Sequence, residues 1–355
     1  MMPLGQNSQN SPLISWTPDG LYCAAGGFHL DPHRAVDTAV ITHAHSDHAR
    51  RGSKRYVCVD RGVGLLRTRL GKNIDVRGVP YGNVITLGST TVSFHSAGHI
   101  LGSAQVRVQS DDEVWVASGD YKRDPDPSCD PFEIVKCDTF ITEATFGTPK
   151  YRWEKSRRHG EDIASWWKEN SAAGFNSILF GYSLGKAQRI LAELAPHADK
   201  PVWIHPTMAE LTECYRAEGI ALAETRVLPR TPDSPGIEAF SGELLLAPPS
   251  VLDGEWREAL GNHRTAFASG WMQGQASGNP FRSYDRGFVL SDHADWNDLN
   301  RTIDDTGASR VFVFHRSESG ALVRHLRSRG IEAHAIDALS PENYARLPAR
   351  NLSLF

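Results

Sequence analysis

The chain from residue 36 to residue 142 alternates between short apolar runs and clusters of turn residues. The runs are rich in β-branched and aromatic side chains, and they cover residues 36–42, 83–87, 90–94, 104–108 and 114–117. Runs of this length, bounded by Gly, Asn, Asp and Ser, are typical of β-strands joined by tight turns. The pattern therefore predicts a mostly antiparallel sheet in this part of the chain.

From about residue 158 onward, apolar residues at helical spacing appear between shorter strand-like runs. Strands are predicted at 177–180, 202–204, 287–290, 310–314 and 331–336, and helices at 185–194, 296–305 and 317–329. This alternation favours an α/β arrangement. The polar first 18 residues are expected to form a loose start. The stretch 223–242 is rich in Pro, Ser and Gly, so it is expected to be a surface connection and not a domain boundary.

The composition is that of an ordinary globular protein, with 355 residues of which 40% are hydrophobic and 23% are charged. This length leaves room for one large domain or two smaller ones. The apolar runs are far shorter than the roughly 18 to 20 residues that a membrane-spanning helix needs. The N-terminus also lacks the charged-then-apolar order of a signal peptide. A cytoplasmic protein with no membrane contact is expected.

The cysteines and the net charge exclude further classes. The five cysteines form no C-x-x-C pair, which argues against a disulfide framework and against a zinc ribbon. The formal net charge is −4, so the surface as a whole does not favour a polyanionic partner. Any contact with nucleic acid is expected to come from local basic patches.

The strongest chemical signal is the stretch Thr-His-Ala-His-Ser-Asp-His at residues 42–48, directly after an apolar run. Alternating His43 and His45 can point to one metal, while the following turn aims Asp47 and His48 at a second metal about 4 Å away. Imidazole and carboxylate ligands suit Zn²⁺ or Mn²⁺. The alternative is a polar loop whose histidines only bind each other, but four residues of ligand type so close together argue against it.

Two residues far along the chain occupy similar positions. His99 lies in a Gly-flanked loop after the run 90–94, and Asp120 follows the run 114–117 in the sequence Ser-Gly-Asp. A third His would complete the first ligand set, and a carboxylate can bridge two metals because it has two oxygens. Taken alone, His99 would more often be an ordinary loop histidine and Asp120 a turn or helix-capping residue.

Three motifs follow one another along the chain, and together they resemble those of the metallo-β-lactamase superfamily of hydrolases. They are His-x-His-x-Asp-His, a His after Gly, and Ser-Gly-Asp. The resemblance covers roughly residues 20–145 and the C-terminal third of the chain. It implies an αββα sandwich with metals at one edge between its two sheets. It also implies that Asp37 matches the family's first acidic motif, which supports the site without binding metal.

Three later motifs resemble those of the β-CASP nucleases within this superfamily. They are Thr-Glu-Ala-Thr-Phe-Gly with Glu143, Ser-Asp-His-Ala-Asp with His293, and His315 after an apolar run. The resemblance implies a cap domain inserted into the sandwich, with the substrate bound between the two. The expected division is 1–157 for the first part of the metallo-β-lactamase domain, 158–284 for an α/β cap and 285–355 for the remaining part.

We assign His315 as a ligand of the second metal, because a His at the end of a strand can reach the ion held by Asp47, His48 and Asp120. The alternative is a His at a helix N-terminus that only forms hydrogen bonds. The β-CASP enzymes that act on RNA usually have this His followed by Gly, and the eukaryotic DNA-specific members tend to have Val. Here Arg316 follows His315.

Five further stretches, residues 26–34, 115–122, 151–153, 185–189 and 267–271, resemble the bacterial ligase-associated DNA exonucleases. This implies a DNA exonuclease in DNA repair, with nucleic acid as partner, DNA favoured over RNA, and a DNA ligase or helicase in the same pathway. The main alternative is an RNA-processing endo- or exonuclease of the β-CASP group. A hydrolase of small esters or amides would lack Glu143, His293 and the cap, and a noncatalytic nucleic-acid binder would lack metal ligands.

Several residues outside the metal motifs are candidates for substrate contact: Ser183, Lys186, Ser269, Trp271, Ser291, Arg152 and Trp153. The loop 181–186 joins a strand to a helix and can present backbone N–H groups and one Lys to a phosphate. The run 150–158 interleaves cations with aromatic residues, as phosphate contact combined with base stacking requires. A plain loop, a packing turn and a solvated charged face are the respective alternatives. Arg50, Arg51, Lys54 and Arg55 form a second basic cluster after the metal loop.

The expected reaction is hydrolysis of a phosphodiester by water that two divalent metals activate. Asp120 would help to bind and orient this water. His293 is the candidate general acid for the leaving oxygen, and Glu143 would hold the His293 ring and keep it protonated.

Overall fold

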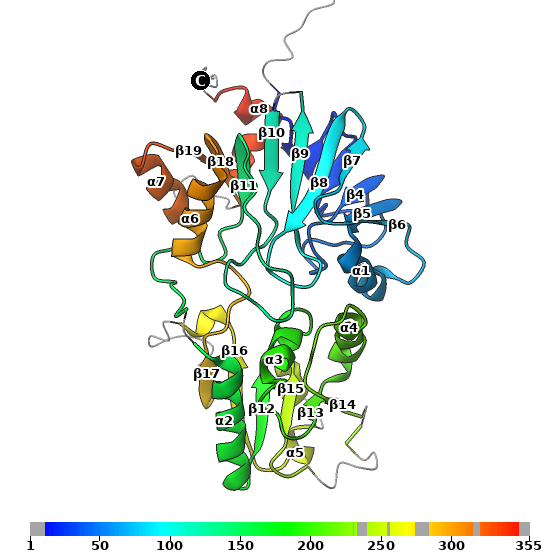
Figure 1. Ribbon diagram of the computed structural model, residues 1–355, viewed down its shortest axis with the longest axis vertical. Coiled ribbons are helices and arrows are strands. Elements are labelled where there is room, and N and C mark those ends of the chain that lie inside the picture. Colours follow the sequence, from blue (N-terminus) through cyan, green and yellow to red (C-terminus); the bar gives the residue numbers. More distant parts are fainter. Residues whose placement is uncertain are drawn as a thin grey trace, which may run out of the picture.

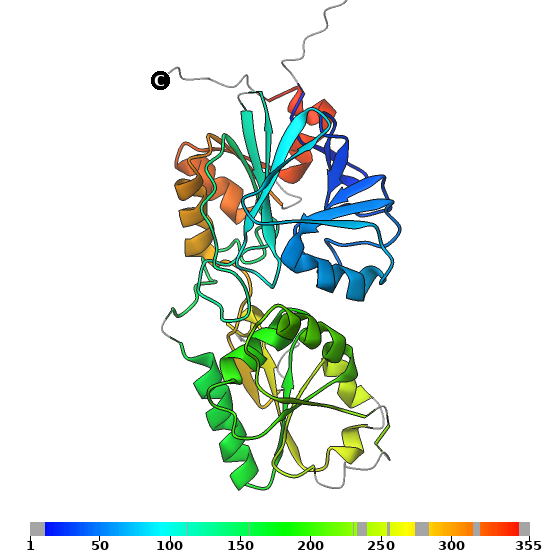
Figure 2. The ribbon, with the colours of Figure 1, turned by 45° about the vertical axis from the view of Figure 1, so that its right-hand side comes forward.

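The computed structural model describes residues 11–111, 113–155, 157–229, 231–232, 240–253, 256–273, 284–314 and 320–347. Figure 1 shows that these residues form two lobes, one above the other. We call residues 11–155 with 291–347 the large lobe and residues 157–290 the small lobe. Figure 2 shows the chain passing between the two lobes where they adjoin. None of the helices in these residues is long and apolar enough to span a bilayer.

The first sheet of the large lobe has six strands in chain order. They are β1 (Ser15–Thr17), β2 (Gly20–Cys23), β3 (Phe28–Leu30), β4 (Thr38–Val40), β5 (Arg55–Val59) and β6 (Val76–Val79). The first three strands are antiparallel, and β3 to β6 are parallel. The 3-10 helix η2 (Asp60–Gly62) and helix α1 (Val63–Leu70) follow β5.

The second sheet has seven strands in the order β19-β18-β11-β10-β9-β8-β7. Their bounds are β7 (Val84–Leu87), β8 (Thr90–Ser96), β9 (Ala104–Ser110), β10 (Glu113–Ala117), β11 (Thr139–Thr142), β18 (Arg310–Val313) and β19 (Glu332–Ala335). Strands β7 to β10 are antiparallel, as predicted, whereas β10, β11, β18 and β19 are parallel. The prediction of a mostly antiparallel sheet is therefore wrong for β4, β5 and β6, which pair in parallel, and for the pairing of β10 with β11. Alternation of apolar residues marks a strand but not the direction of its neighbour.

Apolar side chains join these elements into layers. Phe28 and Val57 of the first sheet share one buried cluster with Phe94 and Trp115 of the second, so the main core lies between the sheets. Helices α6 (Trp296–Thr306) and α7 (Ala321–Ser328) pack their apolar residues against the second sheet, and α1 packs against the first. The 3-10 helix η6 (Ile336–Leu339) and helix α8 (Pro341–Tyr344) end the described chain.

The small lobe is built on a parallel six-stranded sheet in the order β14-β13-β15-β12-β16-β17. Its strands are β12 (Asn176–Phe180), β13 (Val202–Ile204), β14 (Thr225–Val227), β15 (Leu244–Ala247), β16 (His263–Ala268) and β17 (Arg286–Phe288). The helices are α2 (His159–Ala172), α3 (Lys186–Leu194), α4 (Pro206–Ala217), η3 (Pro249–Asp253), α5 (Trp256–Ala259) and η4 (Gly270–Met272). Strand β17 extends this sheet past residue 284, where the sequence placed the cap boundary. Strand β14 lies in the stretch that was expected to be only a connection.

Two kinds of contact hold the lobes together. An apolar one joins Leu65 and Leu66 of α1 to Leu211 and Tyr215 of α4 in one buried cluster. The Tyr215 hydroxyl also accepts a hydrogen bond of 3.3 Å from the Leu101 backbone N–H. The second contact is ionic and is described next.

A buried row of charges, which we call the ion chain, crosses between the lobes. Lys122 and Asp126 of the large lobe form an ion pair, and Asp126 Oδ2 lies 3.2 Å from Arg189 Nε of α3. Asp292 Oδ1 lies 3.4 Å from Arg189 Nη1 and 2.8 Å from Lys186 Nζ. All five side chains are buried. The ion chain therefore fixes the loop after Leu290 to both lobes.

Candidate metal centre and active site

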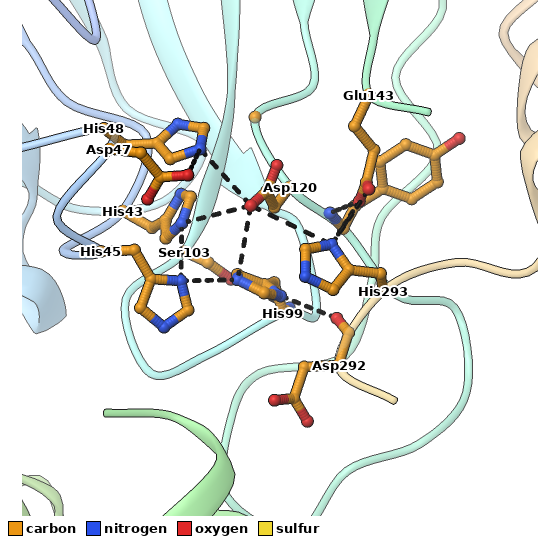
Figure 3. Close-up of polar contacts among 12 residues, drawn as sticks. His43, His45, Asp47, His48, His99, Ser103, Asp120, Glu143, Asp292 and His293 are labelled. Atoms are coloured by element: carbon orange, nitrogen blue, oxygen red, sulfur yellow. Dashed lines mark hydrogen bonds and ion pairs between the residues drawn. The ribbon is translucent and has the colours of Figure 1, made fainter. Parts of the chain in front are cut away.

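A cavity of about 810 Å³ opens between the two lobes. His45, His99 and Asp120 line it and His43 lies buried beside them, all after the ends of strands from the two sheets of the large lobe. His43 and His45 follow β4, His99 follows β8, and Asp120 follows β10. Figure 3 shows their side chains converging on one point. The sequence folds this way because each strand ends in a polar loop at the same edge of the large lobe.

Three imidazole nitrogens meet at the centre of this group. His45 Nδ1 lies 3.0 Å from His43 Nε2 and 3.0 Å from His99 Nε2. These three histidines and Asp120 offer ligand atoms that all lie within 4.8 Å of one another. The arrangement is that of a site that can hold a metal.

The outer nitrogens of His45 and His99 identify where the protons are. His45 Nε2 contacts the Leu184 carbonyl oxygen at 3.1 Å, and His99 Nδ1 contacts the Asp292 carbonyl oxygen at 2.7 Å. A carbonyl oxygen only accepts, so these outer nitrogens carry the protons. The inner nitrogens of both neutral rings therefore carry lone pairs, which face each other.

A third lone pair comes from His43. The Thr42 hydroxyl donates to Asp31 Oδ2 at 2.5 Å, so its oxygen accepts the proton of His43 Nδ1 at 3.1 Å. This leaves His43 Nε2 unprotonated on the inner side. Burial lowers the pKa of each of the three rings and so keeps them neutral. Three lone pairs in such proximity repel one another unless a cation lies between them, so this donor set fits a metal ion.

Asp120 lies between this group and a second one. Its Oδ2 is 3.6 Å from His43 Nε2 and 3.4 Å from His48 Nε2. Burial raises the pKa of Asp120, but the adjacent His48 and other histidines outweigh this and hold the pKa well below its usual range. Asp47 Oδ2 lies 3.7 Å from His48 Nε2 and is largely exposed. Asp47, His48 and Asp120 thus form a second donor group, which the sequence predicted as the second metal site. The expected seventh ligand, His315, lies outside the described residues.

His293 and Glu143 form an ion pair beside this second group. His293 Nδ1 is 3.0 Å from Glu143 Oε2 and 4.0 Å from Asp120 Oδ2. Burial lowers the pKa of His293, but the Glu143 and Asp120 carboxylates outweigh it and raise the pKa to about 9. Glu143 is itself held by the Tyr121 backbone N–H at 2.7 Å. The pair keeps a protonated imidazole at the cavity wall near neutral pH.

Two of the residues expected to bind substrate, Ser291 and Trp153, form hydrogen bonds with the His293 backbone, and Ser291 also lines the cavity. The Ser291 hydroxyl accepts the His293 backbone N–H at 3.1 Å. The Trp153 indole N–H donates to the His293 carbonyl oxygen at 2.9 Å, and Trp153 is not among the residues that line the cavity. Both contacts orient the backbone of His293.

The other expected substrate contacts divide into two classes. Ser183 and Ser269 line the cavity, and the Ser269 hydroxyl accepts the Trp271 backbone N–H. Lys186 also lines it, but its ammonium is buried against Asp292 and the Leu290 carbonyl oxygen. It is therefore not available to a phosphate, contrary to the expectation from its strand-to-helix loop. Arg152 is exposed away from the cavity and donates to the Pro149 carbonyl oxygen.

The structure does not place Asp37 at the site. Its carboxylate is 80% exposed and pairs with Lys54 at 2.6 Å. The supporting role belongs to Asp31, whose carboxylate accepts from the Thr42 backbone and hydroxyl and from His48 Nδ1 at 2.7 Å. Sequence reasoning missed Asp31, although it lies within the stretch 26–34 that resembles the ligase-associated exonucleases. Its positive φ of 43° at the end of β3 has no signature in the sequence.

Of the basic cluster after the metal loop, only Arg50 lines the cavity. Arg51 donates to the Arg69 carbonyl oxygen, and Arg55 lies 3.8 Å from Asp75. Arg69, which the sequence did not single out, lines the cavity and donates to the Ala44 carbonyl oxygen.

The comparisons with known proteins agree with this chemistry. No family model matches the chain. It is 32% identical over 319 residues to an Opitutus terrae protein named "Probable DNA ligase", and 27% identical over 218 residues to Ribonuclease TTHA0252 of Thermus thermophilus. It is also 27% identical over 141 residues to Endoribonuclease YSH1 of Yarrowia lipolytica.

Coverage limits what these similarities carry. The three matches cover 89%, 51% and 39% of this chain, but only 30%, 49% and 16% of the relatives. A crystal structure of a protein of unknown function from Enterococcus faecalis V583 shares the fold, with a TM-score of 0.54, 14% identity, and coverage of 80% of this chain and 76% of that one. The names of the ribonuclease relatives support a metal-dependent nuclease.

Proposed function

We propose that this chain is a β-CASP nuclease of the metallo-β-lactamase superfamily, with the large lobe as its αββα sandwich and the small lobe as its inserted cap. On this proposal the cap runs to about residue 290, because β17 belongs to its sheet. The observation that carries the proposal is the convergence of three imidazole lone pairs and the Asp120 carboxylate on one point of the cavity between the lobes.

The residues present fit two divalent ions, either Zn²⁺ or Mn²⁺. His43, His45 and His99 would hold one ion, Asp47 and His48 would hold the other, and Asp120 would serve both. When bound, such ions lower the pKa of water toward neutrality and offset the negative charge of a phosphodiester. Asp31 would keep His43 and His48 in the required tautomers through Thr42 and through its own carboxylate.

The protein's own contribution to bond cleavage is a proton donor. His293 is protonated near neutral pH because Glu143 and Asp120 raise its pKa. It would give that proton to the leaving oxygen of the phosphodiester, and Glu143 would hold the ring through Nδ1. Ser291 and Trp153 would keep the ring at its place by holding the backbone of His293.

We propose a DNA exonuclease that acts in DNA repair, with RNA processing as the second candidate. The similarity that spans 89% of the chain, to a segment of a protein named "Probable DNA ligase", favours DNA as the substrate and a DNA ligase as a partner in the same pathway. A helicase is the alternative partner that we propose. The shorter similarities to proteins with ribonuclease names favour RNA.

The test is digestion of single-stranded DNA and RNA of the same sequence, labelled at the 5′ or the 3′ end, with Mn²⁺ or Zn²⁺ added in turn. We expect stepwise release of nucleotides from one end of the DNA strand and slower cleavage of RNA. A circular single strand should be resistant. Faster cleavage of RNA would favour the second candidate, and fragments released from the circle would overturn the exonuclease. No cleavage of either polymer with either metal would overturn the nuclease itself.

A further inference from the structure

Exposed aromatic side chains are concentrated in the cavity. Six large hydrophobic side chains are exposed in the described part of the chain, and three of them are aromatic: Tyr182, Trp271 and Phe314. All three line the cavity between the lobes. The three aliphatic ones, Val84, Ile134 and Val227, do not. Exposed aromatic rings around a polar site form a surface that a flat ligand can cover.

Trp271 lies on the His293 side of the cavity. Its ring centre is 4.6 Å from that of Phe146, which in turn lies 6.0 Å from the His293 ring. Gly270 allows this approach, because a Cβ there would come 2.6 Å from the Phe146 ring. The indole is therefore held in place at the side where the leaving oxygen would accept its proton.

Phe314 lies on the side of the second donor group. Its ring centre is 5.4 Å from that of Trp16, and Trp16 is 5.4 Å from His33. His33 is two residues from Asp31, which binds His48. The Phe314 backbone is fixed by a hydrogen bond of 2.7 Å to the Thr142 carbonyl oxygen. Tyr182 belongs to the small lobe and is 57% exposed.

The charges of the cavity wall do not favour a polyanion by themselves. Five acidic residues line the cavity, namely Asp31, Asp47, Asp120, Glu143 and Asp292, against Arg50, Arg69, Lys186 and the protonated His293. Lys186 is paired with Asp292, and Arg69 donates to the Ala44 carbonyl oxygen. Apart from the proposed metal ions, phosphate contact therefore rests mainly on Arg50 and His293, so contacts to the bases would add affinity for a strand.

We propose that Trp271, Phe314 and Tyr182 are stacking platforms for the bases of an unpaired strand, on both sides of the phosphate that is cut. This inference rests on the proposed nuclease function and specifies its substrate as single-stranded nucleic acid with intact bases. An aromatic side chain can stack on an unpaired base of any sequence. In a duplex both faces of each base are already covered by the neighbouring base pairs.

The experiment compares three variants, Trp271→Ala, Phe314→Ala and Tyr182→Ala, with the exposed control Val84→Ala. Each is tested on a single-stranded oligonucleotide, on the same oligonucleotide with abasic positions, and on a short deoxyribose-phosphate strand that carries no base at all. We expect KM for the intact strand to rise by about 5- to 150-fold in the three variants, as loss of one stacked base predicts. Trp271→Phe should restore most of the loss, and Val84→Ala should behave as wild type.

Two further results separate stacking from a structural role. Turnover of the base-free strand should stay within about twofold of wild type, and the variants should not weaken binding of the strand at its abasic positions any further. Tyr182→Ala serves as the variant least able to disturb folding, because its side chain is largely exposed. Unchanged KM for the intact strand in all three variants would overturn the platforms while leaving the nuclease intact. Wild-type protein that cleaves neither the intact strand nor the base-free strand would instead overturn the proposed function.

Discussion

Two buried clusters of ionisable residues meet at Asp292, and they differ in whether each polar group faces a partner of opposite charge. The Asp292 carboxylate belongs to the ion chain, where it lies between Lys186 and Arg189. Its backbone carbonyl oxygen accepts the proton of His99. Together with His43 and His45, His99 forms what we call the histidine cluster. In the ion chain every charge faces an opposite charge. In the histidine cluster, lone pairs face lone pairs.

This difference separates a structural network from a binding site. Buried charges are tolerated when each has a partner, and such a network needs nothing from solution. Burial lowers the pKa of Lys186 to about 8 although Asp292 opposes the shift, so removal from water is a real cost of this network. The histidine cluster leaves its inner nitrogens without a donor, and an external cation would resolve the repulsion.

The largest loss of activity is expected from a change at Asp120, the residue that the two donor groups of the site share. Asp120→Ala should lower the hydrolysis rate by at least about 10⁴-fold. Catalytic residues that act as a unit are not additive, so removing one of them removes most of the rate enhancement that all of them give. The matched control is Asp37→Ala, which removes an exposed carboxylate outside the site and should stay within about twofold of wild type. Steady-state cleavage of a labelled strand measures both. Near-normal activity of Asp120→Ala would break the account of the site.

Glu143→Gln tests the proton donor. Because Glu143 raises the pKa of His293, the protonated imidazole should persist to higher pH in wild type than in this variant. Activity that depends on the protonated form falls as pH rises through that pKa, so the falling alkaline limb should move to lower pH in Glu143→Gln. His293→Ala should lower kcat by about 10²- to 10⁴-fold and keep its metal content. An alkaline limb at the same pH in wild type and Glu143→Gln would contradict this role of the pair.

Asp292→Asn tests the ion chain. It preserves the shape of the side chain and the carbonyl contact to His99 but leaves Lys186 buried without its anion, so the free energy of unfolding should fall by about 3 to 5 kcal/mol. Adding Lys186→Met should recover part of this loss. The control Glu213→Gln breaks an exposed pair with Arg216 and should cost less than about 1 kcal/mol. Denaturant unfolding measures all of them, and a loss in Asp292→Asn no larger than in the control would show that the ion chain is not a structural network.

The dependence of the free energy of unfolding on acidic pH should show a smaller effect. Burial raises the pKa of Asp292, but Lys186 and Arg189 outweigh burial and hold the pKa well below its usual range. The group therefore stabilises the fold above the ordinary aspartate pKa of about 4, and this stability is lost as pH falls toward the depressed value. The free energy of unfolding should decline more steeply below pH 4 in wild type than in Asp292→Asn. An equal decline of the free energy of unfolding with falling pH in both proteins would contradict the lowered pKa of Asp292.

The same comparison explains what the sequence could predict. His43, His45, Asp47 and His48 lie close together in the chain, so their side chains can be assigned to one place without knowledge of the fold. His99 and Asp120 needed the resemblance, and the structure places them with the others. Their roles as ligands stay predictions until metal is measured.

The ion chain could not be predicted, because its members are brought together only by the fold. Lys186 illustrates this: the loop before α3 suggested a phosphate contact, but nothing local indicates that its ammonium turns inward to Asp292. Asp31 was missed for a related reason, since it acts through the Thr42 hydroxyl and the outer nitrogen of His48. In the fold, the apolar pattern predicted strands β4, β7 to β10, β12, β13 and β17 to β19 and helices α3, α6 and α7. The remaining strands and helices, and the parallel pairing, did not follow from it.

The most direct test of the central claim is calorimetric titration of Mn²⁺, and separately Zn²⁺, into metal-free protein. We expect two ions per chain in wild type and in Asp292→Asn, because the ion chain contributes only its backbone to the histidine cluster. His99→Gln should lose one of the two, because it removes one of the three converging lone pairs. Absence of binding in wild type, or binding in His99→Gln equal to that of wild type, would contradict the claim that the histidine cluster is a metal site.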